Sequence, residues 1–188
     1  MGSNSSMTLQ AHENNKPQIY IFNGTTSSGK TTLAKALLDR LDNSYTYLSI
    51  DNHIRTIFES YENHYKGIFE SEKVFSVLIP NLVLTFHDII QSYLLTNKKI
   101  IVDHVLQEKE WKEDLFRKIE HYRVCKIGLF CSIKELEKRE RAREDRKIGL
   151  AAYQYNKVHD NIKYDIELNT EVKDINECIK EIIEKTIK

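Results

Sequence analysis

The chain has 188 residues, the size of one domain that buries a sizeable core. Its 28 basic and 28 acidic residues balance, so there is no net positive charge that would indicate binding to nucleic acid or to an anionic membrane surface. No apolar run approaches the ~20 residues of a membrane span, and the polar N-terminus lacks the apolar core of a signal peptide. The three cysteines show no C-x-x-C spacing, so neither a zinc site nor a disulfide framework is indicated, and a reduced, cytoplasmic protein is expected.

Strand-like and helix-like segments alternate along the chain after a polar tail at 1–16, which is expected to be disordered. This alternation favours an α/β fold whose parallel sheet is covered on both faces. Pro80 is expected to kink or restart the second helix. We predict strands at Gln18–Phe22, Tyr45–Ile50, Lys99–Asp103, Val124–Phe130 and Ile166–Leu168. We predict helices at Lys30–Leu41, Val74–Leu95, Trp111–Ile119, Ile133–Arg146, Ala151–Val158 and Ile175–Ile187, with a helical turn at His53–Phe58.

The stretch Gly24–Thr31 reads G-T-T-S-S-G-K-T and fits the phosphate-binding P-loop pattern G-x-x-x-x-G-K-[ST]. It stands between a predicted strand and a predicted helix, where its backbone N–H groups and the helix dipole can meet phosphate oxygens. Lys30 adds a charge toward the β- and γ-phosphates, and the Thr31 hydroxyl is suited to Mg²⁺. The predicted nucleotide-binding residues are Gly24, Thr25, Thr26, Ser27, Ser28, Gly29, Lys30, Thr31 and Thr32.

Two carboxylates follow predicted strands: Asp51 after Y-T-Y-L-S-I, and Asp103 at the end of I-I-V-D. Ligands of open α/β sheets bind beyond the carboxyl ends of the strands. Asp51 is positioned either to take the proton of an attacking hydroxyl or to cap the following helix. Asp103 is predicted to hold Mg²⁺ directly or through water, with a cap or turn residue as the alternative. For the adjacent His104, a hydrogen-bonded structural role is favoured over a ligand role.

An arginine-rich stretch, R-E-R-A-R-E-D-R, follows the fourth predicted strand. Arg139, Arg143 and Arg146 are spaced i, i+4, i+7 and would share one face of a continuous helix, whereas Arg141 would point elsewhere. Guanidinium groups suit bidentate contacts with phosphate oxygens, as in a lid that closes over a transferring group. A solvated helix with pairs such as Glu135–Arg139 is the alternative. We predict a lid in which Arg139 and Arg143 act in catalysis, and Arg143 and Arg146 bind the nucleotide.

These motifs together resemble the chloramphenicol phosphotransferase-like family of P-loop kinases over roughly residues 18–183. The resemblance is carried by the P-loop, Asp51, I-V-D-H-V at 101–105, I-G-L-F-C-S at 127–132 and R-E-R-A-R-E-D-R-K-I-G-L-A at 139–151, followed by Gln154, Val158-His159 and Tyr164-Asp165. The resemblance implies a parallel five-stranded sheet with flanking helices, and ATP-dependent phosphorylation of a hydroxyl, in the founding members that of chloramphenicol. It places the catalytic base of the family on Asp51.

We therefore predict a P-loop NTPase fold of the nucleotide-kinase type with a helical lid, and one kinase domain over 17–188. The expected reaction uses ATP and Mg²⁺ to phosphorylate a hydroxyl of a small molecule, either a chloramphenicol-like antibiotic or a related metabolite. The segment 52–73 matches the family little, and Tyr61, His64, Tyr65 and Phe69 are expected to line the acceptor pocket. A kinase for a nucleotide, another metabolite, a protein or a sugar nucleotide remains open, as do a non-catalytic nucleotide-binding regulator and the oligomeric state.

Overall fold

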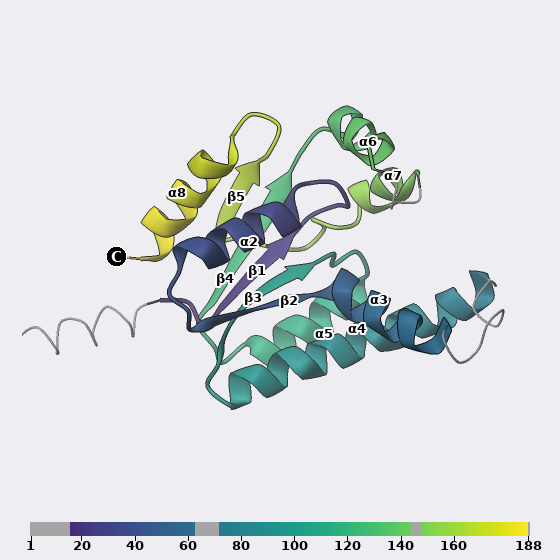
Figure 1. The fold of residues 1–188 in the computed structure, drawn as a ribbon, viewed down its shortest axis with the longest axis horizontal. Helices are drawn as coiled ribbons and strands as arrows, with labels where there is room; N and C mark the ends of the chain where they lie inside the picture. Colours follow the sequence, from purple (N-terminus) through teal and green to yellow (C-terminus); the bar gives the residue numbers. More distant parts are fainter. Residues whose placement is uncertain (1–15, 63–71, 144–147, 188) are drawn as a thin grey trace, which may run out of the picture.

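The computed structural model describes residues 16–62, 72–143 and 148–187 (Figure 1). Of the predicted tail at 1–16, only Lys16 belongs to the described part, where its ammonium pairs with Asp42 at 3.0 Å. The remainder of that prediction lies outside the described residues.

The described residues form one parallel sheet of five strands in the order β2-β3-β1-β4-β5 (Figure 1). The strands are β1 (Ile19–Asn23), β2 (Tyr45–Ser49), β3 (Lys99–His104), β4 (Val124–Phe130) and β5 (Ile166–Asn169). The central strand β1 pairs with β3 on one side and β4 on the other, so that Phe22 lies opposite both Asp103 and Ile127. The predicted five-stranded parallel sheet is confirmed. Its carboxyl edge brings the end of β1 next to the end of β3, where ligands of such sheets bind.

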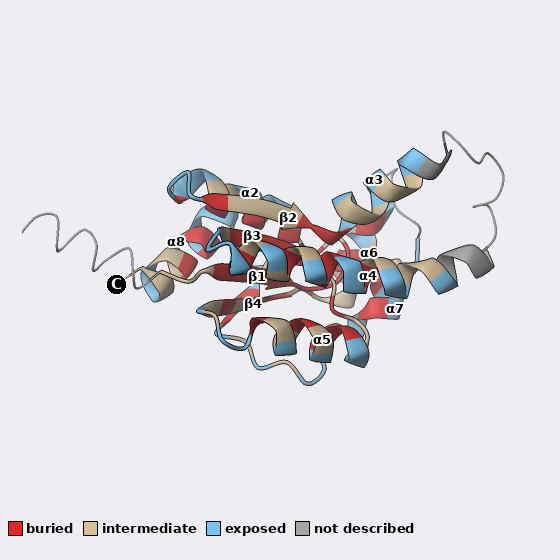
Figure 2. Cartoon of the chain, turned by 90° about the horizontal axis from the view of Figure 1, so that it is seen from below, coloured by how far each residue is buried: buried red, intermediate tan, exposed pale blue. Residues whose placement is uncertain are grey.

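Helices cover both faces of the sheet (Figures 1 and 2). Alternate side chains of β1 point into two cores: Tyr20 and Phe22 pack with α2 and α8, whereas Ile19 and Ile21 pack with α4 and α5. Because β1 and β3 are buried on both faces, their sequences read as near-continuous apolar runs. The helices are α2 (Lys30–Arg40), α3 (Ile50–Glu62), α4 (Glu72–Leu95), α5 (Lys109–Ile119), α6 (Ile133–Arg141), α7 (Leu150–Tyr155) and α8 (Ile175–Thr186).

The segment after β2 differs from the prediction. The expected turn at His53–Phe58 is a 13-residue helix that begins at Ile50, so the last residue of the predicted strand belongs to α3. Ile50 is buried in the core shared with α4, and Ile54 packs against the same core, which explains why the chain turns helical directly after β2. Asp51 therefore lies in the first turn of α3 and is not its cap.

The lid helix also differs from the prediction. α6 ends at Arg141, and the N–H of Ala142 closes its last turn by bonding to Lys138 and Glu140 carbonyls. Arg143 lies beyond the helix, and Arg146 lies outside the described residues. The expectation that Arg143 shares one face of a continuous helix with Arg139 is wrong, and the same expectation for Arg146 falls outside the described residues. The next helix, α7, is shorter than the predicted Ala151–Val158 and begins after Gly149, whose φ of 93° is left-handed.

Helix α4 contains Pro80 within its assigned span, and it does not restart there. Contrary to the expectation from the sequence, Val77–Leu95 is long and apolar enough to cross a membrane by length and composition, with a mean hydropathy of 1.2. This is weak evidence for a span, because core helices of globular proteins pass the same test. In this fold, one stripe of the helix is buried against the sheet, formed by Val83, Phe86, Ile90 and Leu94.

Candidate active site

The loop between β1 and α2 adopts a conformation that needs glycine at two places. Gly29 precedes α2 with a φ of 91°, in the left-handed region where a side chain would be strained. Gly24 lies so close to β4 that an added Cβ would stand 2.8 Å from the Leu129 carbonyl oxygen. These two positions bring the loop backbone tightly around the N-terminus of α2, the end of a helix that attracts anions.

The loop also holds polar groups that no protein group satisfies. The side-chain oxygens of Thr26, Ser27 and Ser28 are buried, and among the described residues none of them has a hydrogen-bond partner. Buried hydroxyls without partners cost free energy, about 1–3 kcal/mol each. Three of them beside a helix N-terminus fit an anion such as a phosphate chain.

Lys30, at the start of α2, is only 7% exposed, and its ammonium donates to the Thr25 carbonyl at 2.7 Å. The next residue, Thr31, donates its hydroxyl to Asp103 Oδ2 at 2.6 Å. The cation, the hydroxyl and the carboxylate predicted from separate motifs are thus brought together at the carboxyl ends of β1 and β3. Hydroxyl and carboxylate oxygens are ligands that Mg²⁺ prefers.

Asp103 is 3% exposed and accepts a second hydrogen bond from the Tyr47 hydroxyl at 3.0 Å. Burial raises the pKa of its carboxyl above the ordinary value, while Lys30 and the Thr31 hydrogen bond act in the opposite direction and the nearby Asp51 adds to the rise. The two carboxylates therefore interact electrostatically, although Asp51 comes from helix α3 and Asp103 from strand β3.

Asp51 is exposed and lines a small cavity together with Lys30, Thr31 and Arg143. This cavity, called the phosphate cavity below, opens at the tip of the P-loop. It gathers predicted site residues from three separate sequence motifs: the P-loop, the start of α3 and the segment after α6.

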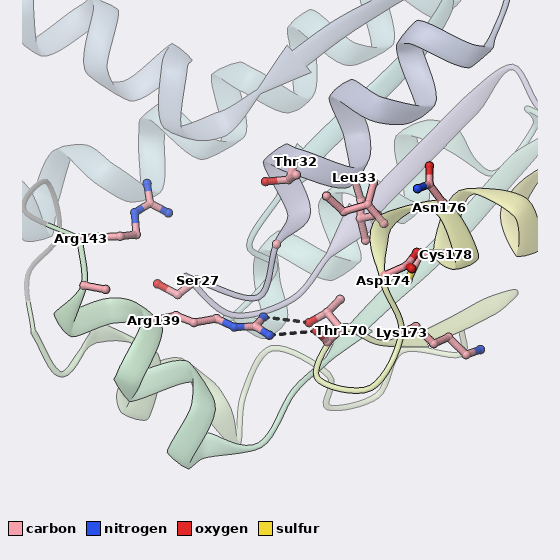
Figure 3. Close-up of a pocket in the computed structure, with 13 residues that line it drawn as sticks. Ser27, Thr32, Leu33, Arg139, Arg143, Thr170, Lys173, Asp174, Asn176 and Cys178 are labelled. Atoms are coloured by element: carbon pink, nitrogen blue, oxygen red, sulfur yellow. Dashed lines mark hydrogen bonds between the residues drawn. The ribbon is translucent and has the colours of Figure 1, made fainter.

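A larger neighbouring cavity of about 690 Å³, called the nucleotide cavity below, lies between the P-loop, α6 and the start of α8 (Figure 3). Arg139 and Arg143 both line it but point in different directions. The Arg139 guanidinium donates to the carbonyl and the hydroxyl of Thr170 at 2.9 and 3.2 Å, and the Thr170 hydroxyl in turn donates to the Ser28 carbonyl at 3.0 Å. Arg139 therefore ties α6 to the P-loop.

The histidine beside Asp103 is structural, as favoured from the sequence. His104 is fully buried and lies 2.9 Å, Nε2 to Nε2, from His87, whose Nδ1 lies 2.9 Å from the Asp114 carboxylate. Burial lowers the pKa of His104 well below its ordinary value, so its ring is neutral.

Sequence reasoning assigned no role to three side chains of the site, although Gln154 was among the residues that carry the family resemblance. Tyr47 and Thr170 contact predicted residues directly, and Gln154 on α7 accepts the N–H of Thr26 at 2.8 Å. A Tyr in a strand and a Thr in a loop belong to no sequence motif that would mark them as site residues. Of the residues expected to line the acceptor pocket, His64, Tyr65 and Phe69 and the side chain of Tyr61 lie outside the described residues, so that expectation stays a prediction.

Comparisons with known proteins agree with this geometry. A model of the chloramphenicol phosphotransferase-like proteins matches residues 17–187. A Mycobacterium tuberculosis protein named "Putative O-phosphotransferase" is 29% identical over 182 residues, covering 89% of this chain and 81% of that protein.

Solved structures share the fold at low sequence identity. A sugar kinase from Janibacter superposes with a TM-score of 0.65 at 14% identity, covering 88% of this chain and 92% of its own. The APS kinase of Mycobacterium tuberculosis, solved with AMPPNP and APS, superposes with a TM-score of 0.61 at 15% identity, covering 90% of this chain and 97% of its own. The fold is therefore that of the P-loop kinases.

Proposed function

The chain belongs to the chloramphenicol phosphotransferase-like family, and from this premise we propose that it is an ATP-dependent phosphotransferase that phosphorylates a hydroxyl of a small molecule. The observation that carries the proposal is the 2.6 Å bond between Thr31 and Asp103 beside the buried Lys30. It joins the P-loop to the strand-end carboxylate at the place where a nucleotide would present its terminal phosphates.

In this proposal the P-loop residues 24–32 hold the phosphates of ATP, with the unpartnered hydroxyls of Thr26, Ser27 and Ser28 as donors. Lys30 exchanges its bond to the Thr25 carbonyl for the β- and γ-phosphate oxygens. The nucleotide cavity beside the loop receives the rest of the nucleotide. Such a site works mostly by positioning and by neutralising charge.

Thr31 and Asp103 would hold Mg²⁺, because their oxygens are the donor set that this ion prefers. When bound, the ion neutralises charge on the phosphate oxygens. The Tyr47 hydroxyl, which also donates to Asp103, orients the carboxylate for this task.

Asp51 is proposed as the base that takes the proton of the acceptor hydroxyl, since it is the exposed carboxylate of the phosphate cavity. Arg143, at the border of both cavities, is proposed to stabilise the transferring group, and Arg146 to contribute to nucleotide binding. Arg139 supports catalysis by holding α6 on the P-loop through Thr170.

The acceptor is proposed to be a chloramphenicol-like antibiotic or a related metabolite that enters between α3 and the lid, and the protein to be one cytoplasmic kinase domain over 17–188. A nucleotide or another metabolite is the alternative acceptor. Neither nucleic acid nor a membrane is a proposed partner, because the chain has no net charge to attract them.

The test is ADP release from Mg²⁺-ATP in the presence of hydroxyl-bearing acceptors: chloramphenicol, other antibiotics, sugars and nucleosides. Acceptor-dependent release by the native protein is expected. Lys30→Met should abolish it at a cost of several kcal/mol in transition-state stabilisation, while Lys180→Met, on the exposed face of α8, should leave it unchanged. Nucleotide binding without transfer to any acceptor would instead favour the non-catalytic regulator.

A further inference from the structure

Gln154 enters the phosphate cavity from the lid side. It lies on α7, is 6% exposed, and lines this cavity with Lys30 and Arg143. Buried amides are usually satisfied on both their oxygen and their nitrogen. The amide of Gln154 is satisfied on one side only.

The orientation of this amide follows from its partner. The backbone N–H of Thr26 lies 2.8 Å from Gln154 Oε1, and because an N–H can only donate, the amide oxygen must face the loop. The amide nitrogen, Nε2, is then the free end of the group. Among the described residues, Nε2 has no hydrogen-bond acceptor, and this nitrogen is not fully buried but keeps some contact with solvent.

The backbone that carries Gln154 is held in place. Glu140 of α6 is 1% exposed, and its carboxylate accepts the N–H groups of Gly149 and Ala151 at 2.7 and 2.9 Å, which fixes the start of α7. The N–H groups of Lys157 and Val158 both donate to the Gln154 carbonyl at 3.0 Å. A donor fixed in this way costs little reorganisation when a ligand arrives.

From these contacts we propose that Gln154 Nε2 donates a hydrogen bond to the γ-phosphoryl group of bound ATP, with the Thr26 N–H holding the amide in the donating orientation. The proposal rests on the proposed function, because it requires a triphosphate in the phosphate cavity. Lys30 and Arg143 line the same cavity against the one carboxylate of Asp51, so its lining carries a net positive charge that suits an anion, and an amide N–H adds a directional donor. Gln154 is thus a catalytic residue of the lid that recognises the group to be transferred.

The experiment measures the dissociation constants of Mg²⁺-ADP and Mg²⁺-AMPPNP, which differ by the γ-phosphoryl group, by calorimetry on the full chain. Gln154→Glu keeps an oxygen for the Thr26 N–H but replaces the donor with a negative acceptor. Gln154→Met removes the donor without adding charge. Asn156→Asp is the matched control, because it makes the same amide-to-carboxylate change at an exposed position two residues along the chain.

For both Gln154 variants we expect AMPPNP affinity to fall roughly tenfold or more, with ADP affinity nearly unchanged and the glutamate variant the more affected. Asn156→Asp should behave like the native protein. Three outcomes would overturn the role of Gln154 while leaving the proposed function standing. They are equal losses of ADP and AMPPNP affinity, unchanged affinities, and tighter nucleotide binding by Gln154→Met through release of the Thr26 N–H. Failure of the native protein to bind either nucleotide would overturn both.

Discussion

Replacing Glu140 by Gln should open the lid. The carboxylate is 1% exposed and accepts two backbone N–H groups, from Gly149 at 2.7 Å and Ala151 at 2.9 Å. Gln keeps one acceptor oxygen and presents an NH₂ group to the other N–H, so one charge-assisted bond is lost and one buried donor is left unsatisfied. A bond to a charged group and an unsatisfied buried donor are each worth about 1–3 kcal/mol, which gives about 2–6 kcal/mol for the substitution. Shape is conserved, so no cavity adds to this value.

This free energy corresponds to a roughly 30- to 20,000-fold increase in the opening equilibrium of the segment that starts α7. Hydrogen exchange of the Gly149 and Ala151 amides measures it directly, and urea unfolding shows whether the loss is local or global. The kcat for phosphotransfer should fall as well, because Arg143 lies between the two helices that Glu140 joins.

The matched control is Glu137→Gln, which removes a carboxylate of the same helix that pairs with Arg141 at 3.9 Å on the surface. Such a pair contributes about 0–1 kcal/mol, so exchange at Gly149 and Ala151 should stay native-like. If Glu140→Gln exchanged these amides no faster than this control, the carboxylate would not hold the lid, and the argument from its two hydrogen bonds would be refuted.

Two further predictions concern the reacting groups. Asp51→Asn should lower transfer to the acceptor by roughly 10²–10⁴-fold with little change in nucleotide affinity, whereas the activity lost in Asp103→Asn should be partly recovered at high Mg²⁺. Single-turnover rates of both variants across a Mg²⁺ titration test these two roles. If high Mg²⁺ restored only the Asp51 variant, the two roles would be reversed. Arg143→Ala should lower kcat more than nucleotide affinity, because Arg143 is proposed to contact the transferring group. Arg141 is exposed in the last turn of α6, so Arg141→Ala should have only a small effect on either quantity. Steady-state kinetics and calorimetry on both variants test this, and equal effects would remove Arg143 from the site.

The sheet and the P-loop could be predicted from the sequence because their signals are local. The central strands β1 and β3 are buried on both faces, so they read as short apolar runs, and helical spacing between the runs requires parallel crossovers. The P-loop needs glycine where the structure shows Gly29 at a φ of 91°, so its pattern can be identified from the local sequence alone. Asp103 was found for the same reason, since it ends the apolar run of β3.

The lid was predicted less well, because its course depends on groups far apart in the chain. Spacing alone favoured a helix through Arg146, but the buried Glu140 bonds forward to Gly149 and Ala151, so the chain leaves the helix after Arg141. The sequence pattern also placed Asp51 just after a strand that ended at Ile50. In the structure Ile50 is buried against the core and already begins α3, so Asp51 lies in the first turn of that helix.

By itself, the sequence determined the P-loop with its two required glycines, the alternation that builds the sheet, and the identity of the carboxylates and arginines available for chemistry. These follow from backbone sterics and from hydrophobic periodicity, which act over a few residues. Only the tertiary structure decided which of these groups meet. The partners Thr31 and Asp103 are 72 residues apart and Thr26 and Gln154 are 128 apart, and such contacts exist only once the tertiary fold has brought them within hydrogen-bond distance.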